Sequence, residues 1–259
     1  MDLEINLLGF ISRLEKHFKY TFASFYLIIA CHSVGIAQSV DHSLWDQLLH
    51  THVAKNGNVN YNAFIKDSNK LNSYLRILEM NPPSPNWNRN EEMAFWINTY
   101  NAYTVKLILS NYPIKGIKEI GGRIPFVNST WDIKFIKIGD ELLDLNNIEH
   151  SKLRKKFNDP RIHMVLVCAS KSCPALPQEA IRSSTLDSQL DQASIIFVND
   201  PFKNSITDTS IQLSMIFKWY AMDFRAAGGV KAFVNNYSKK KLNDKTKIKY
   251  LNYDWSLNE

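Results

Sequence analysis

The sequence lacks the short motifs by which several large enzyme classes are recognised. It contains no P-loop, no other glycine-rich phosphate-binding loop, no HExxH metal-binding motif and no internal repeat. Its basic residues do not follow the arginine-and-aromatic pattern of a nucleic-acid-binding module. These absences argue against a nucleotide-dependent enzyme, a zinc protease, a repeat protein and a nucleic-acid-binding protein. We therefore expect no cofactor, no bound metal and no nucleic-acid partner.

Cysteine is scarce, with three residues in a chain of 259. They are Cys31, Cys168 and Cys173. A zinc centre would need more thiols, or the convergence of His150 and His163 on the second and third cysteines. In an oxidising compartment Cys168 and Cys173, five positions apart, can instead close a short disulfide. A further alternative is that Cys168 is simply a small core residue.

The net charge is close to zero outside one lysine-rich segment. The net charge is +6, and residues 231–249 hold seven lysines against one aspartate, so the rest of the chain is close to neutral. Such a cluster can meet an anionic surface, and Lys239, Lys240 and Lys241 are the candidates for association with a membrane surface. The alternative is an ordinary solvated face. Hydrophobic residues make up 45% of the chain against 22% charged, which is ample for a core.

The N-terminal apolar run, residues 22–30, is far shorter than the roughly 20 residues that a membrane-spanning helix needs. Basic residues precede it and small residues, Gly35-Ile36-Ala37, follow it. This pattern is typical of a signal peptide over residues 1–37 that is cleaved near Gln38. Alternatively, Ile28-Ile29-Ala30-Cys31 resembles a lipobox, in which the signal ends before Cys31 and the thiol is acylated. Either way we expect an exported protein of the periplasm or cell envelope.

Helices and strands are mixed without a regular alternation, which favours the α+β class. We expect one mostly helical domain over residues 43–259, packed around a small mixed or antiparallel sheet. Apolar residues at helical spacing predict helices over 43–55, 63–80, 89–111, 186–198, 215–224 and 230–237. A further helix is predicted to end at Phe157, with Asp144 or Asn146 as its cap and with Asn146 at capping-box spacing from Glu149. Strand character is predicted for 131–138, 162–167 and 249–255, with hairpins at Gly139-Asp140 and around Asp208.

The helix predicted over 89–111 is the best-defined element of the sequence. Asn88 and Glu91 have the spacing of a capping box, and Pro113 forbids continuation beyond the end. Apolar residues surround this helix nearly completely, so we expect it to be central. Asn98 and Asn101 lie within it, and their buried amides need hydrogen-bond partners. Those partners are either a functional site or neighbouring backbone and ordered water.

The segment from Arg161 to Pro174 holds the most reactive side chain of the predicted core. Its apolar run, residues 162–167, predicts a strand buried on both faces, which ends at Cys168. Small residues follow, and their backbone N–H groups can be approached closely. A thiol in that position is arranged as a nucleophile with an oxyanion site would be. Three loop residues are the candidates for binding an oxyanion or an anionic substrate. They are Ser170, Lys171 and Ser172.

Two histidines are candidates for the base that would activate Cys168. His163 precedes Cys168 by five positions in the predicted strand, so their side chains would face opposite sides, with Cα atoms roughly 16 Å apart. His150 shares a helix face with Leu153 and Phe157 and is expected to point towards the core. We therefore prefer His150 as the base, although a purely structural role is the alternative.

Five motifs resemble the family known as domain of unknown function 547. They are AFWINTYNAYTVKLIL (94–109), LNNIEHSKLR (145–154), DPRIHMVLVCASKSCPAL (159–176), LSMIFKWYAMDF (213–224) and YLNYDWSLN (250–258). The resemblance covers essentially the whole chain after Ser43 and implies one domain, without supplying a reaction. It also implies that Cys168 and His150 belong to the family motifs, as do Asn98 and Asn101. The position of Cys173 can be serine in the family, which weakens the case for an obligate disulfide.

A cysteine, a histidine and an asparagine are the parts of a thiol-dependent hydrolase or acyl transferase. The predicted catalytic residues are Cys168, His150, Asn98 and Asn101, the asparagines as orienters of the imidazole. The rival hypothesis is a non-catalytic module of the cell envelope that binds a peptide, a glycan or a partner protein. Its support is the aromatic content of the chain, from which Trp131 is our candidate binding residue. The other tryptophans that motivate this hypothesis are Trp96, Trp219 and Trp255.

Overall fold

The computed structural model describes residues 40–121, 129–207, 210–242 and 247–259, all of which belong to one unit, Ser39–Glu259. The predicted signal sequence over 1–37, the lipobox with Cys31 and the hairpin tip at Asp208 lie outside these residues. Within the described ranges, no helix is both long enough and apolar enough to cross a membrane.

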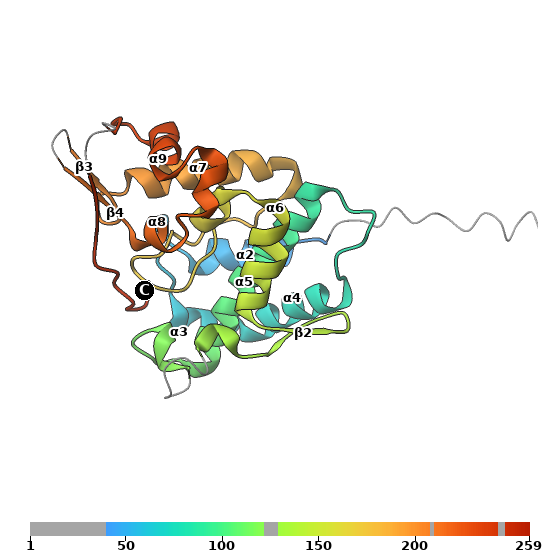
Figure 1. Ribbon diagram of the computed structural model, residues 1–259. Helices are drawn as coiled ribbons and strands as arrows, with labels where there is room; N and C mark the ends of the chain where they lie inside the picture. Colours follow the sequence, from blue (N-terminus) through green and yellow to red (C-terminus); the bar gives the residue numbers. More distant parts are fainter. Residues whose placement is uncertain (1–39, 122–128, 208–209, 243–246) are drawn as a thin grey trace, which may run out of the picture. The chain divides into compact units, whose positions relative to one another are not determined.

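Helices provide most of the secondary structure (Figure 1). The α-helices are α2 (Ser43–His52), α3 (Tyr61–Phe64), α4 (Ser68–Met80), α5 (Arg89–Asn111), α6 (Lys155–Phe157), α7 (Leu186–Asn199), α8 (Met215–Trp219) and α9 (Val230–Tyr237). A π-helix, Asn147–Arg154, leads directly into α6. Shorter 3₁₀ turns are Ile65–Asp67, Ile117–Glu119, Thr130–Asp132, Pro160–Met164, Ser183–Thr185 and Asp223–Ala227.

The strands form two small sheets. In the first, β1 (Ile136–Ile138) pairs antiparallel with β2 (Glu141–Leu143) across a turn in which Gly139 has a φ of 57°. In the second, β3 (Ser205–Ile206), β4 (Ile211–Leu213) and β5 (Ile248–Tyr250) follow each other in that order, with β3–β4 antiparallel and β4–β5 parallel. Both predicted hairpins and the α+β class are therefore confirmed.

Helix α5 is the centre of the larger apolar core. The Asn88 side chain accepts hydrogen bonds from the backbone N–H groups of Asn90 and Glu91, and the Glu91 carboxylate accepts one from Asn88 N–H at 2.7 Å. This is the predicted capping box, which fixes where the helix begins. Every residue from 93 to 105 is buried. Helices α3 and α4 and the π-helix all contact α5, so its predicted central position is confirmed.

The buried side chains fall into two apolar clusters. The larger one contains the inward faces of α2, α4 and α5 and the chain around Val165. The smaller one surrounds the C-terminal helices, where the rings of Phe197, Phe217, Phe224 and Phe233 pack against one another. Residues 162–167 lie between the two, since Met164 belongs to the smaller cluster and its neighbours to the larger.

Some predicted elements end earlier or are interrupted. The helix expected over 63–80 is divided by the 3₁₀ turn Ile65–Asp67, and the one expected over 215–224 ends at Trp219. Strand character over 131–138 is limited to β1, because a capping box between Ser129 and Asp132 closes a 3₁₀ turn around Trp131. The tail expected as a strand over 249–255 pairs only through β5.

The predicted strand over 162–167 is wrong, although all six residues are buried as expected. Asp159 caps a 3₁₀ turn, Pro160–Met164, by accepting a hydrogen bond from Arg161 N–H, and proline is well suited to the first helical position. No described strand pairs with the residues that follow this turn. Instead, the Asn101 side chain donates to Val165 C=O at 2.9 Å and accepts from Val167 N–H at 3.0 Å. One amide thus takes the place of a neighbouring strand.

Asn98, one turn earlier on α5, does the same for another segment. Its amide donates to the carbonyl of Ile181 at 2.8 Å, and its oxygen accepts from Ile181 N–H at 3.0 Å. Both asparagines are almost fully buried. Of the alternatives left open by the sequence, the structure therefore supports backbone binding for both amides.

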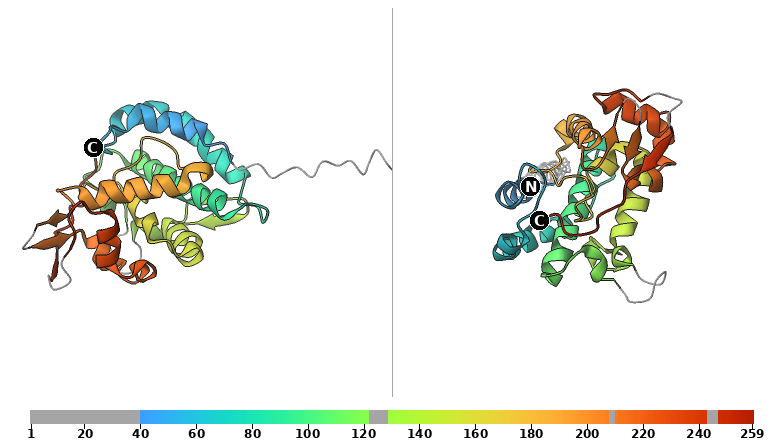
Figure 2. Two further views of the ribbon diagram at one scale, coloured as in Figure 1. Left: turned by 90° about the horizontal axis from the view of Figure 1, so that it is seen from above. Right: turned by 90° about the vertical axis from the view of Figure 1, so that its left-hand side faces the viewer.

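The C-terminal tail connects parts of the chain that are distant in sequence. Figures 1 and 2 show it running from β5 towards α2 and α3. Leu257 forms an antiparallel bridge with Ser170, and the carbonyl of Asn258 accepts a hydrogen bond from Val59 N–H. The Tyr61 hydroxyl donates to the Asn258 side chain at 2.7 Å. The tail therefore fixes the loop after Cys168 against the connection between α2 and α3.

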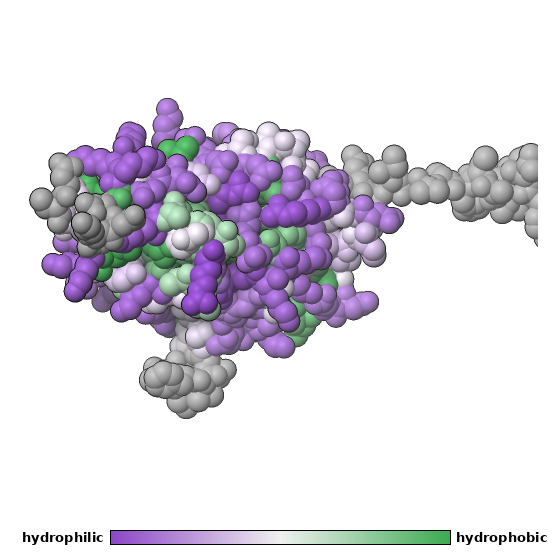
Figure 3. Space-filling model, turned by 45° about the horizontal axis from the view of Figure 1, so that its top comes forward, coloured by the Kyte–Doolittle hydropathy of each residue, from purple (hydrophilic) through white to green (hydrophobic). Residues whose placement is uncertain are grey.

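The surface is mainly hydrophilic on the face shown in Figure 3, with apolar residues in separate patches. Elsewhere among the described residues, Phe202 and Met222 are large apolar side chains that are largely exposed. Single exposed apolar residues of this kind are normal for a folded protein.

We predict that Asn101→Ala lowers the free energy of unfolding by about 3 kcal/mol, because it leaves two buried backbone groups without partners. Urea denaturation followed by circular dichroism measures this change. The matched control is Asn111→Ala at the exposed end of the same helix, where the amide bonds only Leu107 C=O. The control is expected to stay within about 0.5 kcal/mol of the unaltered protein. An equally small effect of Asn101→Ala would contradict the prediction.

Candidate functional site

A cavity of about 200 Å³ lies where the two apolar clusters meet. Residues from α5, the π-helix, the chain around Cys168, α8 and the C-terminal tail contribute to its wall. The lining residues are Tyr100, Trp131, Asn146, Glu149, His163, Leu166, Cys168, Cys173, Ile216, Trp219, Tyr220, Tyr253 and Trp255. The structure thus brings the predicted nucleophile and the predicted binding residue Trp131 to one cavity.

Cys168 is half-buried at this cavity and has three polar neighbours. Its sulfur lies 3.0 Å from the sulfur of Cys173, 3.2 Å from the hydroxyl of Ser170 and 3.3 Å from the hydroxyl of Tyr253. Both cysteines are free thiols. Each of these neighbours carries a proton that it can donate to a Cys168 thiolate.

These donors lower the pKa of Cys168 to about 7, with the hydrogen bond from Cys173 as the largest cause. Burial and the nearby Glu149 carboxylate act in the opposite direction, while Ser170 and Tyr253 add to the lowering. The pKa of Cys173 is raised well above its ordinary value, first by burial and then by its bond to Cys168. Near pH 7 the Cys168 thiol is therefore about half ionised, and the negative charge of the pair is on Cys168 rather than on Cys173.

Tyr253 stays protonated beside that thiolate. Burial and the two neighbouring thiols raise the pKa of its hydroxyl well above the ordinary value. The hydroxyl is also 3.3 Å from Ser170, so one hydroxyl pair faces one side of the Cys168 sulfur. Spacing along the chain offers no reason to select Tyr253, since it lies 85 positions from Cys168.

The C-terminal tail forms backbone hydrogen bonds with the loop after Cys168, which the sequence does not predict. Ala169 has a φ of 56°, in the left-handed region that residues with a side chain seldom adopt. The backbone N–H of Lys171 donates to Ser256 C=O, and that of Ser172 donates to Asp254 C=O. These two amides are therefore not free to bind an oxyanion. The Lys171 side chain is exposed, and of the three predicted loop residues only Ser170 contacts Cys168.

His150 does not face the core, so that prediction is wrong. It is exposed, and its Nδ1 atom lies 2.7 Å from an Arg154 guanidinium nitrogen. The prediction assumed α-helical spacing, whereas residues 147–154 form a π-helix with a wider turn. The inward positions belong to Ile148, Glu149 and Leu153. With Asn98 and Asn101 bound to backbone, the expected Cys/His/Asn arrangement is not assembled.

Glu149 is the cavity residue that the sequence reasoning missed. It is 6% exposed, and the Tyr100 hydroxyl donates to its carboxylate at 3.5 Å. Its spacing from Asn146 resembled a capping box, but the structure shows no cap from Asn146. Asp144 accepts the hydrogen bond from Asn147 N–H instead. The signal that was available is a carboxylate inside the motif LNNIEHSKLR, one position from the chosen histidine.

His163 lines the same cavity as Cys168, contrary to the prediction that they face opposite sides. The prediction failed because residues 160–164 turn in a 3₁₀ helix. The His163 ring stacks on Tyr220 at 3.9 Å, and its Nε2 atom lies 2.7 Å from the Asp223 carboxylate. Arg154 also binds Asp223, through two nitrogens at 2.6 and 2.9 Å.

The cluster of His163, Asp223 and Arg154 stabilises the charged form of Asp223. Burial alone would raise the pKa of Asp223, but the hydrogen bonds from His163 and Arg154 outweigh it and hold that pKa well below the ordinary value. The cluster fixes the π-helix to the 3₁₀ turn Asp223–Ala227 and orients the His163 ring at the cavity wall.

Aromatic rings form the outer wall of the cavity. Trp219, Tyr253 and Trp255 pack on one another with centroid distances of 4.6 to 5.7 Å, and Trp131 meets Trp255 edge to face. Trp219 is 45% exposed, so the wall reaches the surface. Trp96, the fourth tryptophan singled out above, is a core residue of α5.

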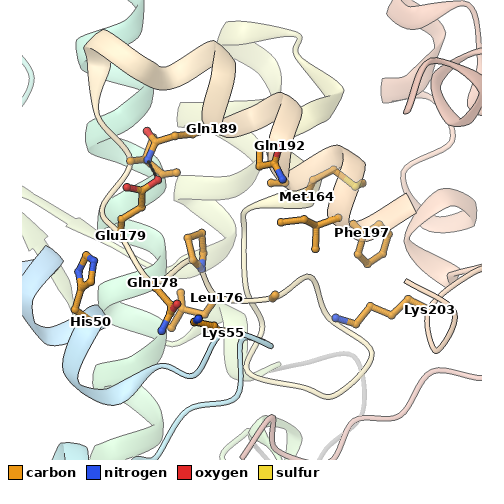
Figure 4. Close-up of a pocket in the computed structure, with 15 residues that line it drawn as sticks. His50, Lys55, Met164, Leu176, Gln178, Glu179, Gln189, Gln192, Phe197 and Lys203 are labelled. Atoms are coloured by element: carbon orange, nitrogen blue, oxygen red, sulfur yellow. Dashed lines mark hydrogen bonds between the residues drawn. The ribbon is translucent and has the colours of Figure 1, made fainter. Parts of the chain in front are cut away.

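A second cavity of about 410 Å³ lies beside α7 (Figure 4). Its apolar wall includes Met164, Leu176 and Phe197, and Lys55 and Lys203 approach it from two sides. Neither Cys168 nor Cys173 lines it. We therefore assign the thiol chemistry to the smaller cavity. Across the described part of the chain, no group of three or more His, Cys, Asp or Glu residues could hold a metal ion.

We predict that Cys173→Ala raises the pKa of Cys168 from about 7 towards the roughly 8.5 of a free thiol, because the largest donor is removed. Tyr253→Phe should raise it by less. The pH dependence of iodoacetamide labelling measures both, with Cys31→Ser in every variant so that the N-terminal thiol does not contribute. The rate of labelling at Cys168 should fall as the pH drops below about 7 in the parent. In the two variants the same fall should begin at a higher pH.

The control is Tyr250→Phe, which removes a hydroxyl from β5 without touching either sulfur. Its labelling profile should match that of the parent. A Cys168 pKa that is the same in Cys173→Ala as in the parent would show that the thiol pair does not set the charge.

Comparison with known proteins agrees with the resemblance drawn from the motifs. No curated protein and no solved structure matches the chain. Residues 84–198 match a family described as "Protein of unknown function, DUF547". The matched range includes α5, the π-helix and both thiols, and it ends before Trp219 and Tyr253. Residues 84–198 of the chain therefore form a region of the DUF547 family of proteins of unknown function.

Proposed function

We propose that this protein is a thiol-dependent hydrolase or acyl transferase in which Cys168 is the nucleophile. The observation that carries the proposal is a thiol with a pKa lowered to about 7, half-buried at a cavity and 3.3 Å from a protonated tyrosine hydroxyl. A thiol that ionises near neutral pH needs no imidazole to remove its proton. The exposed position of His150 is therefore no obstacle.

The reaction uses groups that already surround the sulfur. The Cys168 thiolate attacks an acyl carbonyl, a carbon–sulfur bond forms, and the carbonyl oxygen becomes negative. The Tyr253 hydroxyl is placed to donate a hydrogen bond to that oxygen, as an oxyanion donor does. The carbonyl re-forms as the bond to the leaving group breaks, and the leaving group takes a proton from solvent. Water or an acceptor nucleophile then attacks the thioester and loses a proton to solvent, and the carbon–sulfur bond breaks to release the Cys168 thiolate.

A second candidate is a non-catalytic binding module, which the aromatic wall favours. Tryptophan and tyrosine rings supply large contact areas for a peptide or a glycan. In that case ligand binding would be unaffected by Cys168→Ala and sensitive to Trp219→Ala, a comparison that separates the two candidates directly.

Export to the periplasm or cell envelope belongs to the same proposal. The signal sequence, the alternative lipid anchor at Cys31 and membrane-surface association through the lysine cluster stay predictions. Lys239, Lys240 and Lys241 directly follow α9 and are exposed. An exposed lysine group is what an anionic surface would require.

The test is acylation of the full chain, carrying Cys31→Ser, by p-nitrophenyl acetate at pH 9, where the Cys168 thiol is ionised in every variant. We expect a burst of nitrophenol and an acetyl group on Cys168, found by peptide mapping after an acid quench. Cys168→Ala should abolish both. Tyr253→Phe should slow acylation by about tenfold or more while iodoacetamide labelling is unchanged, because only acylation develops an oxyanion.

Cys173→Ser is expected to keep the acylation, since the second thiol takes no part in it. The proposal fails if Cys168 is alkylated rapidly but forms no acyl adduct with esters or thioesters. It also fails if Tyr253→Phe slows alkylation and acylation equally.

A further inference from the structure

The two thiols of the cavity, Cys168 and Cys173, are in contact but differ in their exposure. Their sulfurs are 3.0 Å apart, so a shift of about 1 Å would bring them to the bonding distance of a disulfide. Cys168 is half-buried at the cavity, whereas Cys173 is 3% exposed. A molecule that enters the cavity therefore meets Cys168 first, with Cys173 directly behind it.

A backbone hydrogen bond can stabilise a thiolate on Cys173 when Cys168 is no longer charged. The N–H group of Cys168 donates to the Cys173 sulfur at 2.9 Å. A hydrogen bond from a backbone N–H stabilises a thiolate on its acceptor. Cys173 can therefore become the attacking thiolate once Cys168 has been converted to an uncharged, bonded sulfur. Acyl transfer makes no use of this arrangement.

We propose that Cys168 and Cys173 form a redox-active dithiol that reduces a cationic or neutral disulfide bound in the cavity. This activity does not depend on acyl transfer. Cys168 is the attacking thiol and Cys173 the resolving thiol, an order fixed by their exposure.

The chemistry takes two exchange steps. The Cys168 thiolate attacks one sulfur of a substrate R–S–S–R′, the new Cys168–S–R bond forms, and R′–S⁻ leaves. Cys173 then attacks the Cys168 sulfur, the Cys168–Cys173 bond forms, and R–S⁻ leaves. The two protons of the cysteines end on the two released thiols. The protein dithiol is oxidised by two electrons and the substrate is reduced by two, and an external thiol or dithiol reductant regenerates the protein.

The cavity wall indicates the charge of the substrate. Its lining includes the Glu149 carboxylate and six tryptophan and tyrosine residues, and none of the described lining residues is a lysine or an arginine. Aromatic faces and carboxylates attract cations. One ring of this wall already binds a cation, because the Lys118 ammonium lies 3.7 Å from the Trp255 ring centroid. A disulfide that carries amino groups fits this wall better than one that carries carboxylates.

The experiment uses the reduced full chain with Cys31→Ser, mixed anaerobically with cystamine, a disulfide with two amino groups. Acid-quenched samples are followed by intact mass and peptide mapping. We expect the parent to become the Cys168–Cys173 disulfide and to release two cysteamine molecules per chain. Cys173→Ser should stop at a cysteamine adduct on Cys168. Cys168→Ser should react with cystamine at least about tenfold more slowly than the parent.

Charge selectivity is tested with dithiodiglycolate, which carries two carboxylates and no amino group. The parent should react with cystamine at least about fivefold faster than with dithiodiglycolate. Glu149→Gln should reduce this ratio of rates. Glu179→Gln is the matched control, because that carboxylate lines the other cavity and should leave the ratio unchanged.

A stable mixed disulfide on Cys168 in the parent, with no closure onto Cys173, would overturn the proposal. So would equal rates for the two disulfides in both the parent and Glu149→Gln. Acylation by p-nitrophenyl acetate separates this outcome from failure of the proposed function. That reaction requires only Cys168 and persists in Cys173→Ser, whereas disulfide reduction requires both thiols.

Discussion

The side chain of Asn101 supports the segment on which the candidate site depends. Residues 165–167 are buried and belong to no described strand, and such a segment must satisfy its backbone groups without water. The amide of Asn101 satisfies two of them from the centre of α5, the most deeply buried helix of the core. Because that helix is fixed by its capping box and by apolar packing, Cys168 is held at a fixed depth.

The π-helix over 147–154 decides the electrostatics of the cavity. Its wider turn places Glu149 inside and His150 outside. The thiol site therefore contains a carboxylate where the sequence predicted an imidazole. The Cys168 thiolate is stabilised by hydrogen-bond donors, chiefly Cys173, against the opposing charge of Glu149. This balance explains why both proposals rest on the ionised thiol of Cys168 rather than on a histidine base.

The cavity also depends on the meeting of distant segments. The smaller apolar cluster brings α8 and Trp219 to one side, and the tail brings Tyr253 and Trp255 to another. The tail is held by backbone bonds to the loop after Cys168 and by the Tyr61–Asn258 bond at its far end. Substrate access and thiol environment are therefore linked to residues that follow the thiols by some 80 positions. None of these contacts is local in sequence.

The sequence by itself determined the α+β class, the central helix with its capping box and both hairpins, and it selected Cys168 as the candidate nucleophile. These features follow from periodicity, turn chemistry and residue type, which act over a few positions. Tertiary structure alone decided that Asn98 and Asn101 bind backbone, that residues 147–154 widen into a π-helix, and that Tyr253 reaches Cys168. Each of these depends on which buried groups lack partners after the chain has packed. Spacing along the chain cannot supply that information, because the partners come from segments dozens of residues away.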